Sequence, residues 1–120
     1  MKNSKTSHAA GLAAETMAAC LLSLKGYRIL ARRYKTPVGE IDLVARRRNT
    51  LAFIEVKSRK RMEEALAAVT PVMQERIIRA AGFFVARHPH MVSFDMRFDL
   101  VAVSPPFYWR HLDNAWRPAT

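Results

Sequence analysis

The chain has a single cysteine, Cys20, among its 120 residues. One cysteine excludes an internal disulfide framework and any cysteine-rich zinc site. Long uncharged hydrophobic runs are missing too, since none reaches the roughly 20 residues that a membrane-spanning helix needs. Yet hydrophobic residues make up 50% of the sequence, which is enough for a packed core. We therefore expect a single domain over residues 1–120, with a flexible segment at 1–7.

Acidic residues are scarce. Asp and Glu total 10 against 20 Lys and Arg, which gives a net charge of +10. Residues 25–61 hold twelve of the basic residues and three of the acidic ones, so the excess is concentrated in one segment. A solvated face that keeps the protein in solution is the ordinary explanation of such a run. The concentration of charge, and the predominance of arginine, favour a phosphate-binding surface instead.

The N-terminal region superficially resembles a signal peptide, because Lys2 and Lys5 precede a largely apolar stretch from Ala9 to Leu24. Glu15 interrupts that stretch, and no small-residue cleavage site follows it. We expect a helix of a cytoplasmic protein. Its apolar stripe is predicted to consist of Ala13, Met17, Cys20, Leu21 and Leu24. Glu15 would then point away from the centre of the stripe, which leaves a surface position and a ligand position both open.

The remaining pattern predicts an alternation of helices and strands. The first helix is expected from Ser7 to Leu24, with Gly26 as its stop. A further helix is expected from the Thr70-Pro71 start signal to His88. Strands are predicted at 27–34, 41–46, 51–57, 94–103 and 107–112, with a helix or loop at 61–69. This order predicts an α/β fold in which helices flank a mixed central sheet.

The second and third predicted strands carry the residues of chemical interest. Glu55 and Lys57 are two apart on a strand and therefore share a face. If the hairpin is symmetric about a four-residue loop, Asp42 lies opposite Glu55, with Cβ atoms roughly 4.5–5.5 Å apart. Two such carboxylates repel each other unless a cation lies between them, and oxygen ligands suit Mg²⁺ or Mn²⁺. An ordinary cross-strand pattern, in which Lys57 merely neutralises Glu55, is the alternative.

Several motifs occur in a characteristic order: Ala14-Glu15, Gly26 to Leu30, Gly39 to Ala45, Phe53 to Lys57, Ala68 to Pro71 with Gln74, and Arg97 to Asp99. On these motifs the chain resembles the YraN-like family of predicted nucleases, in the restriction-endonuclease-like PD-(D/E)xK superfamily. The resemblance runs from about Gly11 to Trp116, so it implies one nuclease-like domain. It also implies an αβββαβ core like that of Holliday-junction resolvases, and metal-dependent cleavage of nucleic acid.

The resemblance also implies roles for individual residues. Asp42 and Glu55 match the metal-binding pair, and the backbone carbonyl of Val56 is a further ligand. Lys57 matches the active-site lysine. Glu15 matches a helix glutamate that completes the metal site through water, and Gln74 an accessory glutamine. Ten basic residues are expected to follow the DNA backbone: Arg28, Arg32, Arg33, Lys35, Arg46, Arg47, Arg48, Arg59, Lys60 and Arg61.

Some positions depart from the family pattern. Arg33 stands where Asn is expected, Met73 stands where a basic residue is expected, and the loop at 46–49 is unusually basic. None of these positions is expected to touch the proposed site residues, so they bear on DNA contacts more than on chemistry.

Three functions remain open from the sequence. The leading one is a Mg²⁺- or Mn²⁺-dependent endonuclease acting on DNA, with branched or structured DNA as a narrower expectation and a homodimer as the assembly that resolvase-like relatives imply. The second is a non-catalytic nucleic-acid-binding module with the same fold. The third, a membrane-surface protein, ranks last because the basic excess lies mainly on strands rather than on an amphipathic helix; we expect no membrane partner.

Overall fold

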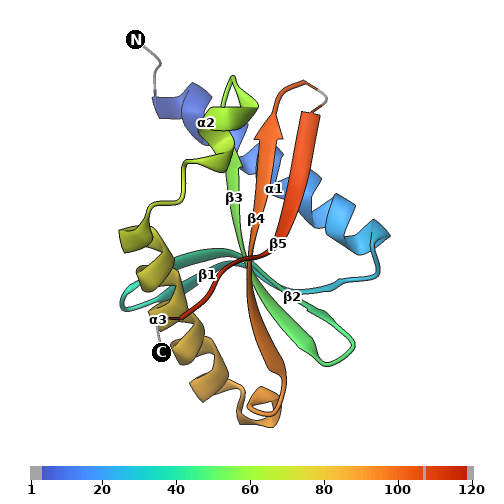
Figure 1. Ribbon diagram of the computed structural model, residues 1–120, viewed down its shortest axis with the longest axis vertical. Helices are drawn as coiled ribbons and strands as arrows, with labels where there is room; N and C mark the ends of the chain where they lie inside the picture. Colours follow the sequence, from blue (N-terminus) through green and yellow to red (C-terminus); the bar gives the residue numbers. More distant parts are fainter. Residues whose placement is uncertain (1–3, 107, 119–120) are drawn as a thin grey trace.

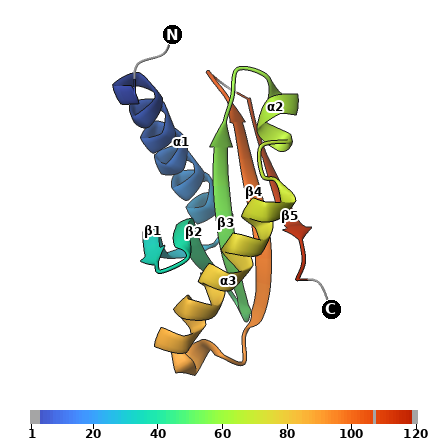
Figure 2. The same cartoon turned by 90° about the vertical axis from the view of Figure 1, so that its left-hand side faces the viewer.

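The computed structural model describes residues 4–106 and 108–118. Residues 1–3, where the expected flexible segment begins, and Phe107, the expected start of the fifth strand, lie outside this range. Helices flank a central sheet (Figures 1 and 2). The helices are α1 (Ser4–Leu24), α2 (Met62–Leu66) and α3 (Pro71–Arg87), followed by a 3₁₀ turn at Pro89–Met91. The strands are β1 (Arg28–Thr36), β2 (Gly39–Arg47), β3 (Thr50–Ser58), β4 (Asp95–Ser104) and β5 (Tyr108–Trp116).

The five strands form one sheet in sequential order, β1 to β5. Strands β3 and β4 are parallel and the other neighbours are antiparallel, so the sheet is mixed, as predicted. A parallel pair needs a crossover connection, which α2 and α3 provide between β3 and β4. The predicted α/β class is confirmed, and the element order is consistent with an αβββαβ nuclease-like core. Among the described residues, none of the helices combines the length and the hydrophobicity that spanning a bilayer requires.

Helix α1 begins at Ser4, three residues before the expected cap at Ser7, so part of the segment expected to be flexible is helical. It ends at Leu24 as predicted, and Gly26, the predicted stop, adopts a φ of 91°. The amide of Tyr27 donates to the carbonyl of Leu22 across this glycine, closing a Schellman motif that fits a residue without a Cβ. This stop turns the chain directly into β1.

Helix α3 starts where the sequence predicts. The Thr70 hydroxyl accepts a hydrogen bond from the amide of Met73 at 3.3 Å, and Pro71 fills the first helical position. All five strands lie at their predicted places. The largest difference is in β5, which continues to Trp116 instead of ending at 112.

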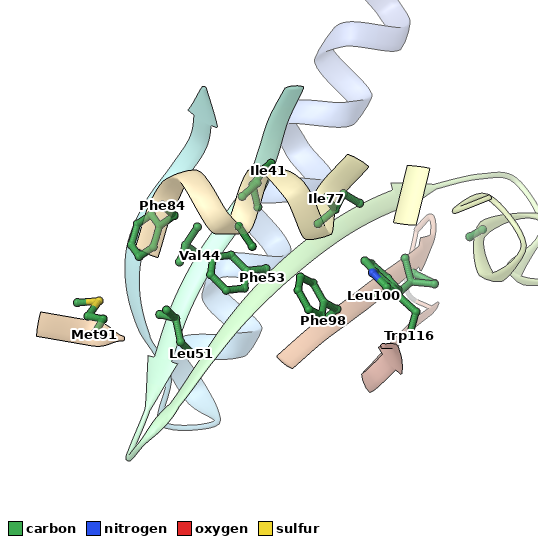
Figure 3. Packing of buried hydrophobic residues seen from close by; sticks show 14 residues of the cluster. Ile41, Val44, Leu51, Phe53, Ile77, Phe84, Met91, Phe98, Leu100 and Trp116 are labelled. Carbon is green, nitrogen blue, oxygen red and sulfur yellow. The ribbon is translucent and has the colours of Figure 1, made fainter. Parts of the chain in front are cut away.

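The sheet is covered on both faces, so its central strand is largely buried. One cluster lies between the sheet and α3 and joins Val44, Leu51, Phe53 and Phe98 to Ile77 and Phe84 (Figure 3). The other lies under α1 and joins Leu43, Ala52, Ile54 and Val101 to Ala14, Ala18 and Leu22. A strand between two covered faces is expected to be a continuous hydrophobic run, as residues 51–54 are. Packing on both sides therefore holds β3 in place up to Glu55.

The buried face of α1 differs from the predicted stripe. The fully buried apolar positions are Ala14, Ala18 and Leu22. Of the predicted stripe, Ala13 and Cys20 are exposed and Leu24 is 85% exposed, so the prediction is wrong for these three residues, whereas Met17 and Leu21 are half-buried. Small alanine side chains let the helix backbone lie close to the sheet, and close packing outweighs the burial of the larger residues. Rotating the helix in this way buries Glu15 beside Ala14.

Candidate functional site

The candidate site lies where the pairing of β2 with β3 ends. The paired residues run from the turn as far as Leu43 opposite Ile54, one position before Asp42 and Glu55. Beyond that point Oδ2 of Asp42 accepts a hydrogen bond from the backbone amide of Val56 at 2.8 Å. The Asp42 carboxylate thus replaces a strand partner at the place where the two strands part. The register predicted from a symmetric hairpin agrees with this arrangement, although the connecting turn is only Arg48-Asn49.

Glu55 is the most deeply buried member of the site, with 7% of its surface exposed. The Lys57 Nζ lies 3.7 Å from Glu55 Oε1, which confirms that the two side chains share a face of β3. Burial, together with the charge and hydrogen bonding of Asp42, raises the pKa of Glu55 to about 9, although Lys57 offsets part of the rise. At neutral pH the Glu55 carboxyl therefore keeps a proton unless a cation takes its place.

Glu15 approaches the same site from α1. It is buried, and its pKa is raised by that burial and by the charge of Asp42, whereas Arg33 and Arg32 lower it. The rotated packing of α1 explains the burial, since Glu15 adjoins the face that contacts the sheet. Of the two positions left open by the sequence, the surface position is therefore excluded, and the ligand role of Glu15 stays a prediction.

The expectation that the family departures lie away from the site residues is wrong for Arg33. Its Nε lies 3.5 Å from Glu15 Oε1. Arg33 also has a φ of 53°, in the left-handed region that Asn tolerates better than Arg does. The Asn that the family pattern expects at this position would suit the backbone and would leave Glu15 without this positive neighbour.

Gln74 occupies the first turn of α3, as predicted, and is half-buried. Its amide nitrogen donates to the carbonyl of Val69 at 3.3 Å. Within the described residues, no hydrogen bond joins it to Asp42, Glu55 or Lys57. Its accessory role therefore stays a prediction.

The oxygen atoms of the candidate site can be compared with the ligands that a divalent metal ion requires. In the described part of the chain, no three His, Cys, Asp or Glu side chains are arranged to hold a metal by themselves. Mg²⁺ does not require such a group, because it commonly binds one or two carboxylates and keeps several waters. Glu15 Oε1 and Glu55 Oε2 are buried oxygens without a hydrogen-bond partner among the described residues. Buried polar atoms normally have partners, so these oxygens fit a hydrated Mg²⁺ or Mn²⁺.

The predicted DNA-contacting residues fall into three groups on the surface. Arg28, Arg32, Arg33 and Lys35 lie on the edge strand β1, Arg59, Lys60 and Arg61 follow β3, and Arg46, Arg47 and Arg48 lie at the β2–β3 turn. Several of them also make structural contacts. The guanidinium of Arg46 lies 4.5 Å from the centre of the Phe94 ring, and Arg32 donates to the Thr16 hydroxyl at 3.0 Å. The turn group lies at the closed end of the hairpin, whereas Asp42 and Glu55 follow the last β2–β3 pair at its open end.

Sequence reasoning missed most of a second buried polar cluster. Asp99 is fully buried and accepts two hydrogen bonds from Arg97, as the i, i+2 spacing on one strand face suggests. It also accepts from His111 Nε2 at 2.8 Å and from the amide of Asn114 at 3.0 Å. His111 pairs opposite Val101 across β4 and β5, and no sequence signal predicts this register.

Taken together, fold and site define a small α/β protein with a nuclease-like element order and a carboxylate pair beside a lysine where two strands separate. The model of the family described as Uncharacterised protein family UPF0102 matches residues 14–103, a range that contains every proposed site residue from Glu15 to Gln74. The chain belongs to this family, also called YraN, which confirms the resemblance drawn from the motifs.

Similar curated proteins carry the same family name. A UPF0102 protein of Parvibaculum lavamentivorans is 53% identical over 108 residues, which cover 90% of this chain and 81% of that protein. One of Rhodopseudomonas palustris strain BisB18 is 54% identical over 106 residues, covering 88% and 78%. One of Bradyrhizobium diazoefficiens is 51% identical over 110 residues, covering 92% and 83%.

Proposed function

We propose that this protein is a Mg²⁺- or Mn²⁺-dependent endonuclease that hydrolyses phosphodiester bonds in DNA, with branched or otherwise structured DNA as its narrower substrate class. The observation that carries this is the approach of Asp42 to Glu55, beside Lys57, in a chain of net charge +10. Two adjacent carboxylates in a buried setting require a proton or a cation between them. A substrate with one negative charge at each phosphate would be drawn to the basic surface around them.

The residues have distinct roles in this mechanism. Asp42, Glu55 and the Val56 carbonyl would hold the divalent ion, and Glu15 would complete the site through water. When bound, the ion would lower the pKa of a water molecule and neutralise charge on the scissile phosphate. Lys57, held beside Glu55, would orient the attacking water or stabilise charge on the phosphate.

The basic groups on β1, after β3 and at the β2–β3 turn would contact the DNA backbone. They would fix the position of the duplex without reading its sequence, because phosphate contacts carry no base information. We expect the enzyme to act in the cytoplasm, and a homodimer is the assembly that the resemblance to resolvases implies.

A non-catalytic nucleic-acid-binding module is the second candidate, and the contact between Arg33 and Glu15 favours it. A guanidinium 3.5 Å from Glu15 already supplies part of the positive charge that a metal would supply. Such a module would bind DNA in a salt-dependent manner but would show no turnover with any divalent ion.

The two candidates are separated by cleavage assays on linear, single-stranded and four-way DNA with Mg²⁺, Mn²⁺ or EDTA. Asp42→Asn keeps an oxygen that can accept from the Val56 amide but lacks the charge, so cleavage should fall at least about a hundredfold while DNA binding stays the same or tightens. Asp113→Asn makes the same chemical change at an exposed position of β5 and is the matched control. Asp113→Asn should cleave like the parent protein.

Cleavage that needs metal and disappears in Asp42→Asn alone supports the endonuclease. Salt-dependent binding without cleavage on any substrate supports the binding module. Equal cleavage by Asp42→Asn and the parent protein would remove Asp42 from the mechanism.

A further inference from the structure

A cavity of about 720 Å³ lies at the opposite end of the β2–β3 hairpin from the candidate site. We call this cavity the distal pocket. It is lined by Lys25, Gly26, Arg47, Arg48 and Thr50. They come from the segment that follows α1 and from the β2–β3 turn region, which a hydrogen bond from Arg47 to the Lys25 carbonyl joins. The volume lies within the range of small-molecule sites. Three of the five lining residues are cationic, so the pocket suits an anion.

The Arg47 side chain is already held in place. Its guanidinium lies 4.4 Å from the centre of the Tyr27 ring, and its Nη1 donates to the Lys25 carbonyl at 3.2 Å. The Tyr27 ring also lies 5.7 Å from the guanidinium carbon of Arg97, which Asp99 fixes with two hydrogen bonds. Little conformational freedom is therefore left to lose when Arg47 meets a ligand.

Lys25 is held by the same buried cluster. Its Nζ donates to His111 Nδ1 at 2.6 Å, so the opposite ring nitrogen, Nε2, carries the proton that is donated to Asp99. An ammonium group has three N–H donors, and this contact uses one of them. Its partner is a ring nitrogen and not a carboxylate, so no ion pair among the described residues offsets the Lys25 ammonium beside the pocket.

Arg48 supplies the third charge from the turn itself. Its side chain is exposed, and its φ of 56° is left-handed. Only its backbone carbonyl is used by a neighbour among the described side chains, accepting from Arg46 Nε at 3.0 Å. Three positive groups around one cavity repel each other, which is an unfavourable arrangement unless an anion enters it.

We propose that the distal pocket binds a backbone phosphate of the nucleic-acid substrate, away from the bond that is cleaved. This rests on the proposed function for the identity of the substrate. Arg47 lies five positions after Asp42 on β2, or about 16 Å along the strand. A duplex covers that length in about five base pairs. The pocket would therefore hold the substrate several nucleotides from the candidate active site and set its register.

The test measures binding of full-length protein to duplex DNA in EDTA, over a series of salt concentrations. EDTA prevents cleavage, so the outcome does not depend on catalysis. Arg48→Asn removes one pocket charge and keeps a residue that tolerates the left-handed turn. We expect several-fold weaker binding and a salt dependence lower by about one charge. Arg79→Gln, an equal loss of charge on α3, should change the salt dependence by less.

A second variant and a small probe sharpen the test. Lys25→Gln can still donate to His111 but lacks the charge, so it should weaken DNA binding as Arg48→Asn does. Inorganic phosphate added to the parent protein should shift the NMR signals of the Gly26 and Thr50 amides, and duplex DNA should displace it. These signals should not respond to phosphate in Arg48→Asn.

The outcomes distinguish this site from the proposed function. Weaker binding by both pocket variants supports the pocket even if no cleavage is ever detected. Equal effects of Arg48→Asn and Arg79→Gln overturn it even if cleavage depends on Asp42. Phosphate or a free nucleotide that occupies the pocket without competition from DNA also overturns it, since the site would then belong to a small anion.

Discussion

Two buried acids on neighbouring strands, Asp99 and Glu55, differ in their hydrogen-bond partners and in the direction in which their pKa is shifted. Asp99 on β4 pairs with Ile54 on β3, the residue next to Glu55. Asp99 accepts four hydrogen bonds. Although burial would raise its pKa, the bonds from His111 and Arg97 lower it below the ordinary value. Glu55 has one oxygen without a partner among the described residues, and its pKa is raised. Both acids are buried, so the number of hydrogen-bond donors around each carboxylate explains why their pKa values shift in opposite directions.

The contrast assigns the two clusters to different tasks. A carboxylate whose oxygens are all satisfied by the protein has no capacity left for a ligand, and it stabilises the fold by fixing its partners. A carboxylate left with an unsatisfied oxygen weakens the fold and is still able to bind a cation. Asp99 thus fixes the positions of Arg97 and His111, whereas Glu55, beside Asp42, keeps an oxygen to which the described residues donate no hydrogen bond.

The largest expected effect is the loss of stability in Asp99→Ala. Removing this carboxylate leaves Arg97, which is largely buried, without its partner and orphans His111 and the Asn114 amide. Breaking one side of a buried ion pair typically destabilises a protein by about 3–5 kcal/mol. Urea unfolding of the parent protein and the variant measures this loss.

Glu55→Gln is the matched comparison in the same experiment. Because Glu55 carries a proton at pH 7 without metal, the neutral amide resembles its resting state, and the change in unfolding free energy should stay within about 1 kcal/mol. If Glu55→Gln proves as destabilising as Asp99→Ala, the two acids do not differ in the way described.

The next effect is a dependence of stability on pH that comes from Glu55. Its pKa is about 9 in the folded protein and 4.5 in the unfolded chain, so between these values the folded state holds a proton that the unfolded state lacks. The stability contributed by this proton is complete below pH 4.5 and is lost as the pH rises toward 9, by at most about 1.4 kcal/mol per pH unit.

Thermal unfolding in EDTA between about pH 5 and pH 9 tests this sign. Glu55→Gln should flatten the fall in stability, and Mg²⁺ or Mn²⁺ should restore stability mainly at the alkaline end, where the ion no longer competes with the proton. Parent protein that grows more stable over the same range, or a decline as steep in Glu55→Gln as in the parent protein, would contradict this assignment of the proton. A shallower residual decline in Glu55→Gln is expected from Glu15, whose pKa is also raised.

Sequence patterns predicted the structure correctly where it depends on residues that are close together in the chain. The Thr70-Pro71 start of α3, the Gly26 stop of α1 and the juxtaposition of Asp42 and Glu55 follow from caps, turns and strand alternation. Each of these depends on residues close in the chain or on a single short hairpin.

Sequence patterns gave wrong or incomplete predictions where the structure depends on packing between elements that are distant in the chain. Helix α1 is apolar nearly all round, so its sequence does not define which side meets the sheet, and alanines rather than Leu24 were buried. The contact of Arg33 with Glu15 depends on that rotation and was missed with it. His111 was missed because β5 extends beyond its predicted end and its register is set by β4.

The smallest expected effect concerns Arg33, and it tests whether Glu15 belongs with Glu55 among the unsatisfied acids. Arg33→Asn relieves a left-handed backbone that disfavours long side chains by roughly 1–2 kcal/mol. It also removes a partly exposed ion pair worth about 0–1 kcal/mol. We expect a net gain of about 0.5–1 kcal/mol in urea unfolding, and tighter binding of Mn²⁺, because the competing guanidinium has gone from beside Glu15.

Arg33→Gln separates the two causes, since it loses the ion pair but keeps a side chain unsuited to the left-handed region. It should bind Mn²⁺ as tightly as Arg33→Asn while being less stable. Equal stability of the two variants would refute the backbone argument, and unchanged Mn²⁺ affinity in both would exclude Glu15 from the metal site. In that second case Glu15 would act only as the charge partner of Arg33, and metal binding would be confined to Asp42, Glu55 and the Val56 carbonyl.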